Sequence, residues 1–303
     1  MSKVGGLPKP RVAILGTGRM GSAAARRLSA LGFPLTLWNR TREKAQALAE
    51  EIGAAVARSP VEAVSQAEIA AAYLADDDAL FSVLAGIRRM DGLVFVNMGT
   101  NTPRAVSNAK NYVTGNGGCY VEAPIVAGPR VLQRGEAVLI VAGEKTCIAQ
   151  ASPLLEALSS HTVYVGEEPE RAQALKLSFN LLLITTVNSL SEALALAESY
   201  GIGKDVVKEL LSHTVFRGIA EKYVDRATSD PAKPASFPLR LAAKDLYYAV
   251  SSAFDRGLPL EGVATVMEKY LRAVREGLGE ADYTRIYWLD RKEKEAQETS
   301  KQG

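Results

Sequence analysis

The sequence predicts an α/β fold, with an N-terminal doubly wound, Rossmann-type parallel sheet and a C-terminal all-α domain built on a long helix. Three observations predict it. Short apolar strands alternate with helical segments from Arg11 to about Val165. A glycine-rich turn joins the first strand to the first helix, and after Pro169 a long, mostly apolar stretch runs to Tyr200 without a further glycine or proline. At 303 residues the chain is long enough for two domains, which we place at 1–166 and 167–303.

The expected strands of the first domain are short and apolar. They are Val12–Leu15, Leu35–Trp38, Ala54–Ala57, Ile69–Leu74, Leu93–Asn97, Cys119–Val121, Ala137–Ala142 and Val163–Val165. Helical segments lie between them, such as Glu43–Ile52, Pro60–Ser65, Asp77–Ile87 and Thr146–Leu158. This alternation is typical of parallel strands with helices on both faces of the sheet.

The turn after the first strand has the spacing G-x-G-x-x-G and leads into the helix-forming segment Ser22–Leu28. Gly16 permits the tight turn, Gly18 lets a pyrophosphate approach the backbone, and Gly21 lets helix and strand pack closely. The free N–H groups at the start of the helix then face the phosphates. A purely structural turn is the alternative. We predict a dinucleotide site formed by Gly16, Thr17, Gly18, Arg19, Met20 and Gly21.

The end of the second strand predicts which dinucleotide binds. An acidic residue there favours NAD, whereas an arginine accommodates the 2′-phosphate of NADP. The chain has Trp38-Asn39-Arg40-Thr41 at this point, without an acid. Arg40 is suited to pair with a phosphate, and Asn39 and Thr41 offer neutral donors. We therefore expect NADP(H), although a solvated surface arginine is the alternative.

The segment from Pro169 to Tyr200 predicts one helix of about thirty residues that is apolar nearly all round, so it has to be buried on several sides. One protomer is not expected to cover it, which predicts a homodimer or a dimer-based homo-oligomer. After Gly201, further helices are expected at Val206–Leu211, Phe216–Ala227, Leu239–Arg256 and Leu260–Glu276.

Composition and charge exclude several classes of function. A net charge of +2 without a basic stripe argues against nucleic-acid binding. Cys119, Cys147, His161 and His213 lack metal-ligand spacing, so we expect no metal, and two cysteines make no disulfide framework. The longest apolar run is too short to span a bilayer, and residues 1–10 lack the apolar core of a signal peptide. We expect a cytoplasmic protein with a flexible N-terminal lead and a frayed, charged tail from Asp290.

Two polar residues interrupt the long apolar helix. Lys176 and Asn180 are four apart and share one face. Burying them without a purpose would be costly. Hydride transfer at a carbonyl carbon needs a group that gives or removes a proton at the oxygen, and a desolvated lysine with a lowered pKa suits that role. The alternative is a lysine that extends to solvent from a domain hinge.

Together these segments resemble the β-hydroxyacid dehydrogenases, over roughly Arg11 to Tyr287. This family includes 3-hydroxyisobutyrate dehydrogenase, the glyoxylate and succinic semialdehyde reductases and, more distantly, 6-phosphogluconate dehydrogenase and the imine reductases. Four motifs carry the resemblance. They are the glycine loop, the segment 122–128 (E-A-P-I-V-A-G, similar to the family's D-A-P-V-S-G-G), Lys176 with Asn180 (K-x-x-N-N), and Lys244-Asp245-Leu246 preceded by Phe237 (K-D-L).

The resemblance implies roles for the matching residues. Lys176 would be the general acid or base, and Asn180 would help to hold the substrate. Lys244 would reach the nicotinamide end of the cofactor and help to bind substrate, with Asp245 orienting it locally. The cofactor would also be contacted by Leu74, Ala75 and Asp76 and by the segment 97–100 that ends in Thr100, and the substrate by Val126, Ala127 and Gly128.

The chain departs from the family pattern in its substrate loop. Val126 stands where the family has a carboxylate-binding serine, Ala127 replaces a glycine, and Phe179 replaces the first asparagine of K-x-x-N-N. A branched apolar side chain removes a donor and makes the pocket drier and narrower. Carboxylate binding would then use backbone N–H groups near Ala127 and Gly128, Lys244 or Arg130. Further candidates for shaping the pocket are Phe179, Arg217 and Tyr223.

We therefore predict an NADP-dependent oxidoreductase that acts on a small 3-hydroxy acid or the matching aldehyde or oxo acid. Serine, 3-hydroxyisobutyrate, glyoxylate and succinic semialdehyde are the candidates. The alternative is an NADPH-dependent imine reductase, which Val126 favours and Lys176 disfavours, since imine reductases usually carry Asp or Tyr at that position. A non-catalytic NADP-binding protein is a third hypothesis.

Overall fold

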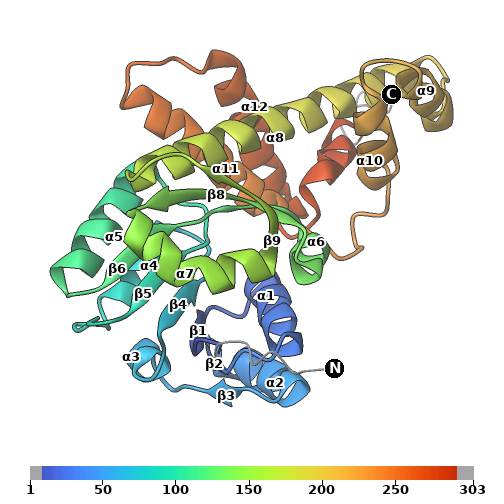
Figure 1. Cartoon of the computed structure of the whole chain (residues 1–303). Coiled ribbons are helices and arrows are strands. Elements are labelled where there is room, and N and C mark those ends of the chain that lie inside the picture. Colours follow the sequence, from blue (N-terminus) through green and yellow to red (C-terminus); the bar gives the residue numbers. More distant parts are fainter. Residues whose placement is uncertain (1–8, 292–303) are drawn as a thin grey trace. The chain divides into compact units, whose positions relative to one another are not determined.

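The computed structural model describes residues 9–291, so the N-terminal lead up to residue 8 and the tail from residue 292 lie outside the described part. The chain divides into two compact units, Met1–Lys176 and Leu177–Gly303. The first unit contains the sheet and its helices, and the second contains helices (Figure 1). The domain boundary that we place between residues 166 and 167 stays a prediction.

The sheet of the first unit has the strand order β3-β2-β1-β4-β5-β6-β8-β7, and β9 pairs with β8. Its strands are β1 (Val12–Leu15), β2 (Leu35–Trp38), β3 (Ala55–Val56), β4 (Ile69–Ala72), β5 (Val94–Asn97), β6 (Cys119–Glu122), β7 (Ile125–Val126), β8 (Ala137–Gly143) and β9 (Ser159–Tyr164). The order of the first six strands is that of a doubly wound dinucleotide-binding sheet. The expectation of an all-parallel sheet needs correction, because β8 runs antiparallel to β6 and β7.

Helices cover both faces of this sheet (Figure 1). One face packs against α1 (Arg19–Ala30), α2 (Arg42–Ile52), α6 (Pro129–Arg134) and α7 (Lys145–Leu158). The other packs against α3 (Pro60–Val64), α4 (Asp77–Leu84) and α5 (Pro103–Gly115). All four residues of β1 are buried, since alternate side chains enter the two cores. The continuous apolar run of this strand therefore follows from burial on both faces.

The strand register brings the carboxyl ends of the central strands to one edge. Leu15 of β1 lies opposite Trp38 of β2 and Ala72 of β4. Ala72 lies opposite Asn97 of β5, which in turn lies opposite Glu122 of β6. The segments that follow these strands therefore begin side by side. The order reverses between β1 and β4, which is where doubly wound sheets bind their ligands.

The second unit is helical and has its own core. Its elements are the main part of α8 (Pro169–Ser199), α9 (Lys204–Ser212), α10 (Arg217–Ala227), α11 (Leu239–Phe254), α12 (Glu261–Ala273), a π-helical turn (Val274–Leu278) and a 3₁₀ turn (Tyr283–Ile286). Ile184 and Val187 of α8 pack in one apolar cluster with Leu246 of α11 and Tyr270 of α12.

The predicted long helix is present as α8, which has 31 residues. By length and composition alone it could cross a bilayer, since an 18-residue window has a mean hydropathy of 1.4. Core helices of globular proteins share this property, and 39% of the window is buried inside the protein. Its apolar character is therefore explained in part by the core it enters.

Cys119 and Cys147 form a disulfide, which the sequence analysis did not anticipate. Cys119 begins β6 and Cys147 lies in α7, and the two are 28 residues apart. The pairing depends on how α7 returns over the sheet to β6. Sequence spacing alone did not predict this contact.

Candidate active site

The glycine loop has the close contacts that its spacing predicts. Gly16 has a φ of +102°, and a Cβ there would lie 2.6 Å from the carbonyl oxygen of Tyr73. A Cβ at Gly21 would lie 1.9 Å from the carbonyl oxygen of Gly16. By contrast, a Cβ at Gly18 would meet nothing within 4 Å. Gly16 and Gly21 are therefore required by packing within the protein, whereas Gly18 borders open space.

The residues around this open space fit the phosphates of a dinucleotide. Gly18 is the N-cap of α1 without a side-chain cap, so the first N–H groups of the helix have no intrahelical acceptor. Thr17 is 5% exposed, and its Oγ1 is buried without a hydrogen-bond partner. A phosphate oxygen would accept hydrogen bonds from both kinds of donor. Arg19 is exposed beside them, and Met20 is half-buried.

At the end of β2 the side chain of Asn39 makes two hydrogen bonds within the protein. Its Oδ1 accepts a hydrogen bond from the backbone N–H of Thr17 at 3.0 Å, and its Nδ2 donates to the carbonyl oxygen of Thr41 at 2.9 Å. Asn39 therefore fixes the glycine loop to the start of α2, and its amide is already engaged. Arg40 and Thr41 are both exposed, and Thr41 caps α2 without a side-chain hydrogen bond. Arg40 and Thr41 remain the candidate partners of a 2′-phosphate.

The predicted cofactor-contacting segments follow β4 and β5. Leu74 is half-buried and Ala75 is exposed, whereas Asp76 is the N-cap of α4 and accepts a hydrogen bond from Ala79 N at 2.9 Å. Thr100 is half-buried in the segment between β5 and α5. Asp76 thus has a structural function at the same edge of the sheet as the glycine loop.

The predicted substrate loop runs from β6 through β7 to the start of α6. Val126 packs against a small apolar cluster that contains Ile140 of β8 and Ala172 of α8. Ala127 is half-buried, and Gly128 is exposed as the N-cap of α6. The side chain of Val126 therefore extends the apolar wall formed by β8 and the first turns of α8.

Lys176 lies on α8 at the end of the first unit and is only 8% exposed. Gln173 is one turn earlier on α8, so the two residues share a face of the helix. The side chain of Gln173 donates to the carbonyl oxygen of Gly99 at 3.0 Å and to Glu122 at 2.7 Å. The turn of α8 that leads to Lys176 is therefore fastened to the ends of β5 and β6.

The second unit groups the other polar residues of the motifs. Asn180 is 4% exposed and donates from Nδ2 to Asp245 at 2.6 Å. Asp245 also forms an ion pair of 3.0 Å with the Nζ of Lys244, which lies 4.4 Å from the ring centre of Tyr248. The structure thus brings Asn180, Lys244 and Asp245 together. Asp245 has the local orienting position that the resemblance implies.

The remaining candidates have varied surroundings. Arg130 is exposed, and Phe179 is 39% exposed. Arg217 forms an exposed ion pair with Glu221, and Tyr223 is buried in the helical core. Phe237 packs against Tyr283, with ring centres 5.2 Å apart. These contacts explain Arg217, Tyr223 and Phe237 by local structure.

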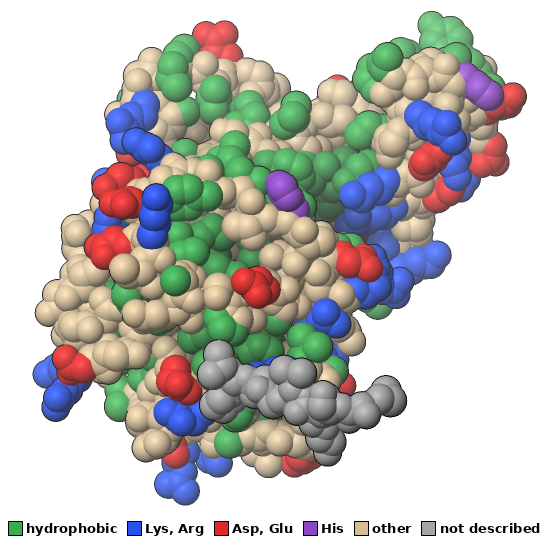
Figure 2. All heavy atoms as spheres, in the orientation of Figure 1, with side chains coloured by type: hydrophobic (Ala, Val, Ile, Leu, Met, Phe, Trp, Pro, Cys, Tyr) green, Lys and Arg blue, Asp and Glu red, His purple; other side chains and the backbone are tan. Residues whose placement is uncertain are grey.

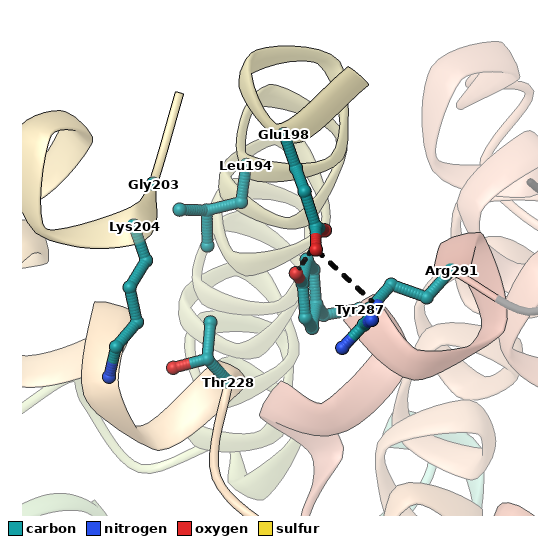
Figure 3. Close-up of a pocket in the computed structure, with 7 residues that line it drawn as sticks. All are labelled: Leu194, Glu198, Gly203, Lys204, Thr228, Tyr287 and Arg291. Atoms are coloured by element: carbon teal, nitrogen blue, oxygen red, sulfur yellow. Dashed lines mark hydrogen bonds and ion pairs between the residues drawn. The ribbon is translucent and has the colours of Figure 1, made fainter. Parts of the chain in front are cut away.

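A pocket of about 230 Å³ lies within the second unit and contains none of the predicted site residues. Figure 3 shows Glu198 pointing toward Tyr287 and Arg291, with Lys204 on the opposite side. Glu198 accepts from the hydroxyl of Tyr287 at 2.5 Å and lies 3.6 Å from Arg291. These three polar side chains of the pocket therefore interact with one another. Among residues 9–291, no group of three or more His, Cys, Asp or Glu side chains is placed to hold a metal ion.

The sequence places Glu122 only at the start of the segment 122–128 and does not predict that its carboxyl is a buried hydrogen-bond acceptor. Glu122 is fully buried and accepts hydrogen bonds from Tyr120, Gln173 and Asn97. Burial raises the pKa of Glu122 to about 8, although these three donors act in the opposite direction. The i, i+2 spacing of Tyr120 and Glu122 on one strand was the available signal, because it places both side chains on one face.

Comparison with known proteins agrees with this architecture. Residues 11–166 match the family described as the NAD binding domain of 6-phosphogluconate dehydrogenase. Residues 171–289 match the family described as NAD-binding of NADP-dependent 3-hydroxyisobutyrate dehydrogenase. Glyoxylate/succinic semialdehyde reductase 1 of Arabidopsis thaliana is 28% identical over 280 residues, which cover 91% of this chain and 96% of the relative.

Solved structures show the same fold. The structure of Mycobacterium tuberculosis 3-hydroxyisobutyrate dehydrogenase with L-serine has a TM-score of 0.80 at 20% identity, covering 93% of this chain and 99% of that one. A reductive aminase from Aspergillus terreus in complex with NADPH4, cyclohexanone and allyl amine has a TM-score of 0.61 at 24% identity, covering 92% of this chain and 98% of that one. The two family matches agree with the strand order and with the glycine loop. The chain therefore belongs to the β-hydroxyacid dehydrogenase family and is a nicotinamide-dependent oxidoreductase.

Proposed function

We propose that the protein transfers a hydride between NADP(H) and a small 3-hydroxy acid or its aldehyde or oxo-acid counterpart, with Lys176 as the general acid or base. One observation carries the proposal. Lys176 is a buried lysine on the turn of α8 that Gln173 fastens to the carboxyl ends of β5 and β6. In the same unit, the glycine loop follows β1 at that edge of the sheet.

The proposed chemistry assigns the proton to this chain. When bound, a nicotinamide supplies the hydride in reduction and accepts it in oxidation. In reduction, the Nζ of Lys176 donates a proton to the carbonyl oxygen, so that an alcohol forms and the amine becomes neutral. In oxidation, the neutral amine removes the hydroxyl proton. A lysine side chain is suited to this exchange, since general acid–base catalysis needs a group that can both give and take the proton at the substrate oxygen.

A substrate panel tests the proposed reaction. NADPH oxidation is measured with glyoxylate and succinic semialdehyde, and NADP reduction with serine and 3-hydroxyisobutyrate, beside a cyclic imine in the reductive direction. We expect turnover of at least one carbonyl–alcohol pair and a lower kcat/KM for the imine. Exclusive turnover of the imine would refute the proposal.

An imine reductase is the second candidate, because Val126 forms part of an apolar wall where the family pattern has a serine hydroxyl. A drier pocket favours a substrate without a carboxylate. Lys176 argues against this candidate, since it matches the lysine of the hydroxyacid dehydrogenases. The alternative predicts that Val126→Ser lowers turnover of the cyclic imine.

The preference for NADP(H) rests on Arg40. It is exposed at the end of β2, and within the described residues it makes no ion pair or side-chain hydrogen bond. We expect Arg40→Ala to raise the KM for NADPH about tenfold to a hundredfold, because a charge-assisted hydrogen bond contributes about 1.5–3 kcal/mol. The KM for NADH should change little. Steady-state kinetics with both cofactors measure this.

The control for Arg40→Ala is Arg89→Ala, which removes an arginine whose partner is the exposed Asp91. This control should leave both KM values unchanged. A wild-type preference for NADH, or an equal effect of Arg40→Ala on the two cofactors, would contradict the assignment.

We also propose a homodimer through the helical unit. Several large apolar side chains of this unit are exposed, among them Leu182, Leu196, Val206 and Leu210. Figure 2 shows hydrophobic side chains at the surface of this unit, along α8 and on α9. Exposed apolar area of this kind is typical of an interface. Sedimentation equilibrium should give twice the mass of one chain, and Leu182→Glu with Leu196→Glu should reduce it to one.

A further inference from the structure

A buried polar cluster in the first unit connects the predicted segments 74–76, 97–100 and 122–128 with the turn of α8 that precedes Lys176. Its side chains are Asp77, Asn97, Asn101, Tyr120, Glu122 and Gln173. Four of them, Asn97, Asn101, Glu122 and Gln173, are fully buried. A satisfied polar cluster in a core holds its members in one arrangement. Its hydrogen bonds therefore indicate which segments it positions.

Glu122 accepts hydrogen bonds from three different side chains of the cluster. Its carboxyl accepts from the hydroxyl of Tyr120 at 2.6 Å, from Nε2 of Gln173 at 2.7 Å and from Nδ2 of Asn97 at 3.0 Å. Tyr120 is two residues earlier on β6, and Asn97 lies opposite Glu122 on β5. The carboxyl thus joins two strands and α8 at one point.

The other members extend these bonds to the neighbouring loops. Asn97 donates to Asn101 at 3.0 Å, and Asn101 donates from Nδ2 to Asp77 at 2.9 Å. Asp77 begins α4, directly after the predicted cofactor segment 74–76, and also accepts from the hydroxyl of Thr102 at 2.7 Å. Gln173 accepts from the N–H of Asn101 at 3.1 Å. The segment 98–101 is therefore held between α4, β6 and α8.

The groups around Glu122 act on its protonation in opposite directions, because its hydrogen-bond donors lower its pKa while burial and Asp77 raise it. Tyr120 is buried, and burial and the adjacent carboxyl raise its pKa well above the ordinary value. Asp77 at the start of α4 raises the pKa of Glu122, and Glu170 on the first turn of α8 raises that of Tyr120. Lys176 lies on the next turn of α8 after Gln173. Burial of the carboxyl is the largest of these effects, and it penalises the charged form.

We infer that Glu122 is a positioning residue that works as a neutral carboxylic acid, and that through Gln173 and Asn97 it holds Lys176 and the cofactor-contacting segments in place. This inference rests on the proposed role of Lys176. Glutamine is then the matched substitute, since it is neutral, has the same shape, and its amide oxygen accepts from Gln173 and Asn97 as Oε1 of Glu122 does. Its NH₂ faces the hydroxyl of Tyr120, which would accept a hydrogen bond from it in place of donating one. Alanine removes all these bonds and leaves the donors of the cluster buried without an acceptor.

Thermal unfolding against pH tests the protonation state without any substrate. The folded protein keeps the proton of Glu122 up to about pH 8, whereas an unfolded glutamic acid loses it near 4.5. Its stabilising contribution is therefore complete below pH 4.5 and is lost as the pH rises to about 8. We expect the Tm of the wild type to fall more than that of Glu122→Gln between pH 6 and pH 9, by about 5 °C or more. Identical profiles would overturn the inference.

Infrared spectroscopy provides an independent measurement of the same state. At pH 6.5 the wild type should show the carbonyl band of a protonated carboxyl that Glu122→Gln lacks. The matched control is Glu168→Gln, which removes an exposed carboxylate of the same unit that pairs with Lys110. The control should keep both the band and the wild-type Tm profile.

Kinetics at pH 7 then test positioning. We expect Glu122→Gln to keep kcat within about threefold, and folded Glu122→Ala to lose about a hundredfold in kcat with a smaller change in the KM for substrate. The affinity for NADPH should fall in Glu122→Ala and stay constant in Glu122→Gln. Fluorescence titration measures this affinity, and the measurement does not require an active enzyme. A folded Glu122→Ala with wild-type kcat and NADPH affinity would refute the positioning role. An inactive wild type with the expected affinities would refute only the proposed reaction.

Discussion

Replacing Lys176 by methionine is expected to lower kcat by a factor of about 10² to 10⁴, the range that a positioned acid or base contributes. Methionine is similar in length and apolar, and Lys176 is 8% exposed, so the fold should persist. The loss should therefore appear in turnover. Stopped-flow or steady-state measurement of NADPH oxidation with an active carbonyl substrate provides the value.

The affinity for NADPH separates this role from a structural one. Lys176→Met should keep the wild-type dissociation constant, because the glycine loop and Arg40 are unchanged. Lys110→Met is the matched control, since Lys110 is another lysine of the first unit and pairs with Glu168 at 3.3 Å. It should retain full activity. If Lys176→Met kept full activity as well, the proton would have another source, and the proposed mechanism would be wrong.

The two glycines of the loop should respond differently to the same substitution. At Gly21 an added Cβ would lie 1.9 Å from the carbonyl oxygen of Gly16, so Gly21→Ala should displace α1 from β1 and cost several kcal/mol of stability. At Gly18 the added Cβ would meet nothing within 4 Å. Gly18→Ala should therefore keep the wild-type Tm. Its methyl group would stand where the pyrophosphate approaches, and NADPH affinity should fall at least about tenfold.

Calorimetry and fluorescence titration measure the two effects separately. Gly115→Ala is the control, because Gly115 ends α5 and its added Cβ would also meet open space. This variant should match the wild type in both Tm and affinity. A Gly18→Ala protein with unchanged NADPH affinity would show that the open space beside the loop does not receive the pyrophosphate.

The fold class could be predicted because its determinants are local in the sequence. Four buried residues of β1, the three-glycine turn and the helix former after it form a continuous pattern, and each part has one structural explanation. The 31-residue helix α8 was equally evident, since no glycine or proline interrupts it. The short strand β7 was missed, because two residues give no periodicity. The antiparallel direction of β8 and the disulfide between Cys119 and Cys147 were not predicted, because both depend on how the chain folds back onto β6.

The motifs of the site could be predicted from the sequence. The hydrogen-bond partners of the individual side chains could not. The sequence predicts Asn39 as a cofactor-contacting residue, and the structure adds that its amide joins Thr17 to Thr41. The sequence identifies Glu122 only as the first residue of a motif, whereas its buried carboxyl accepts hydrogen bonds from side chains of β5, β6 and α8. The bonds of Asn97 and Gln173 to Glu122 join residues 25 and 51 positions apart. Only the three-dimensional arrangement reveals them.

Isotope transfer tests the central claim most directly. The protein is incubated with NADPH that carries deuterium at the transferable position of the nicotinamide, together with glyoxylate, succinic semialdehyde and a cyclic imine in separate reactions. We expect deuterium at the carbinol carbon of a hydroxy-acid product, one per NADPH consumed, and its loss in Lys176→Met. Label found only in the amine formed from the imine, or NADPH consumed without label in any product, would contradict it.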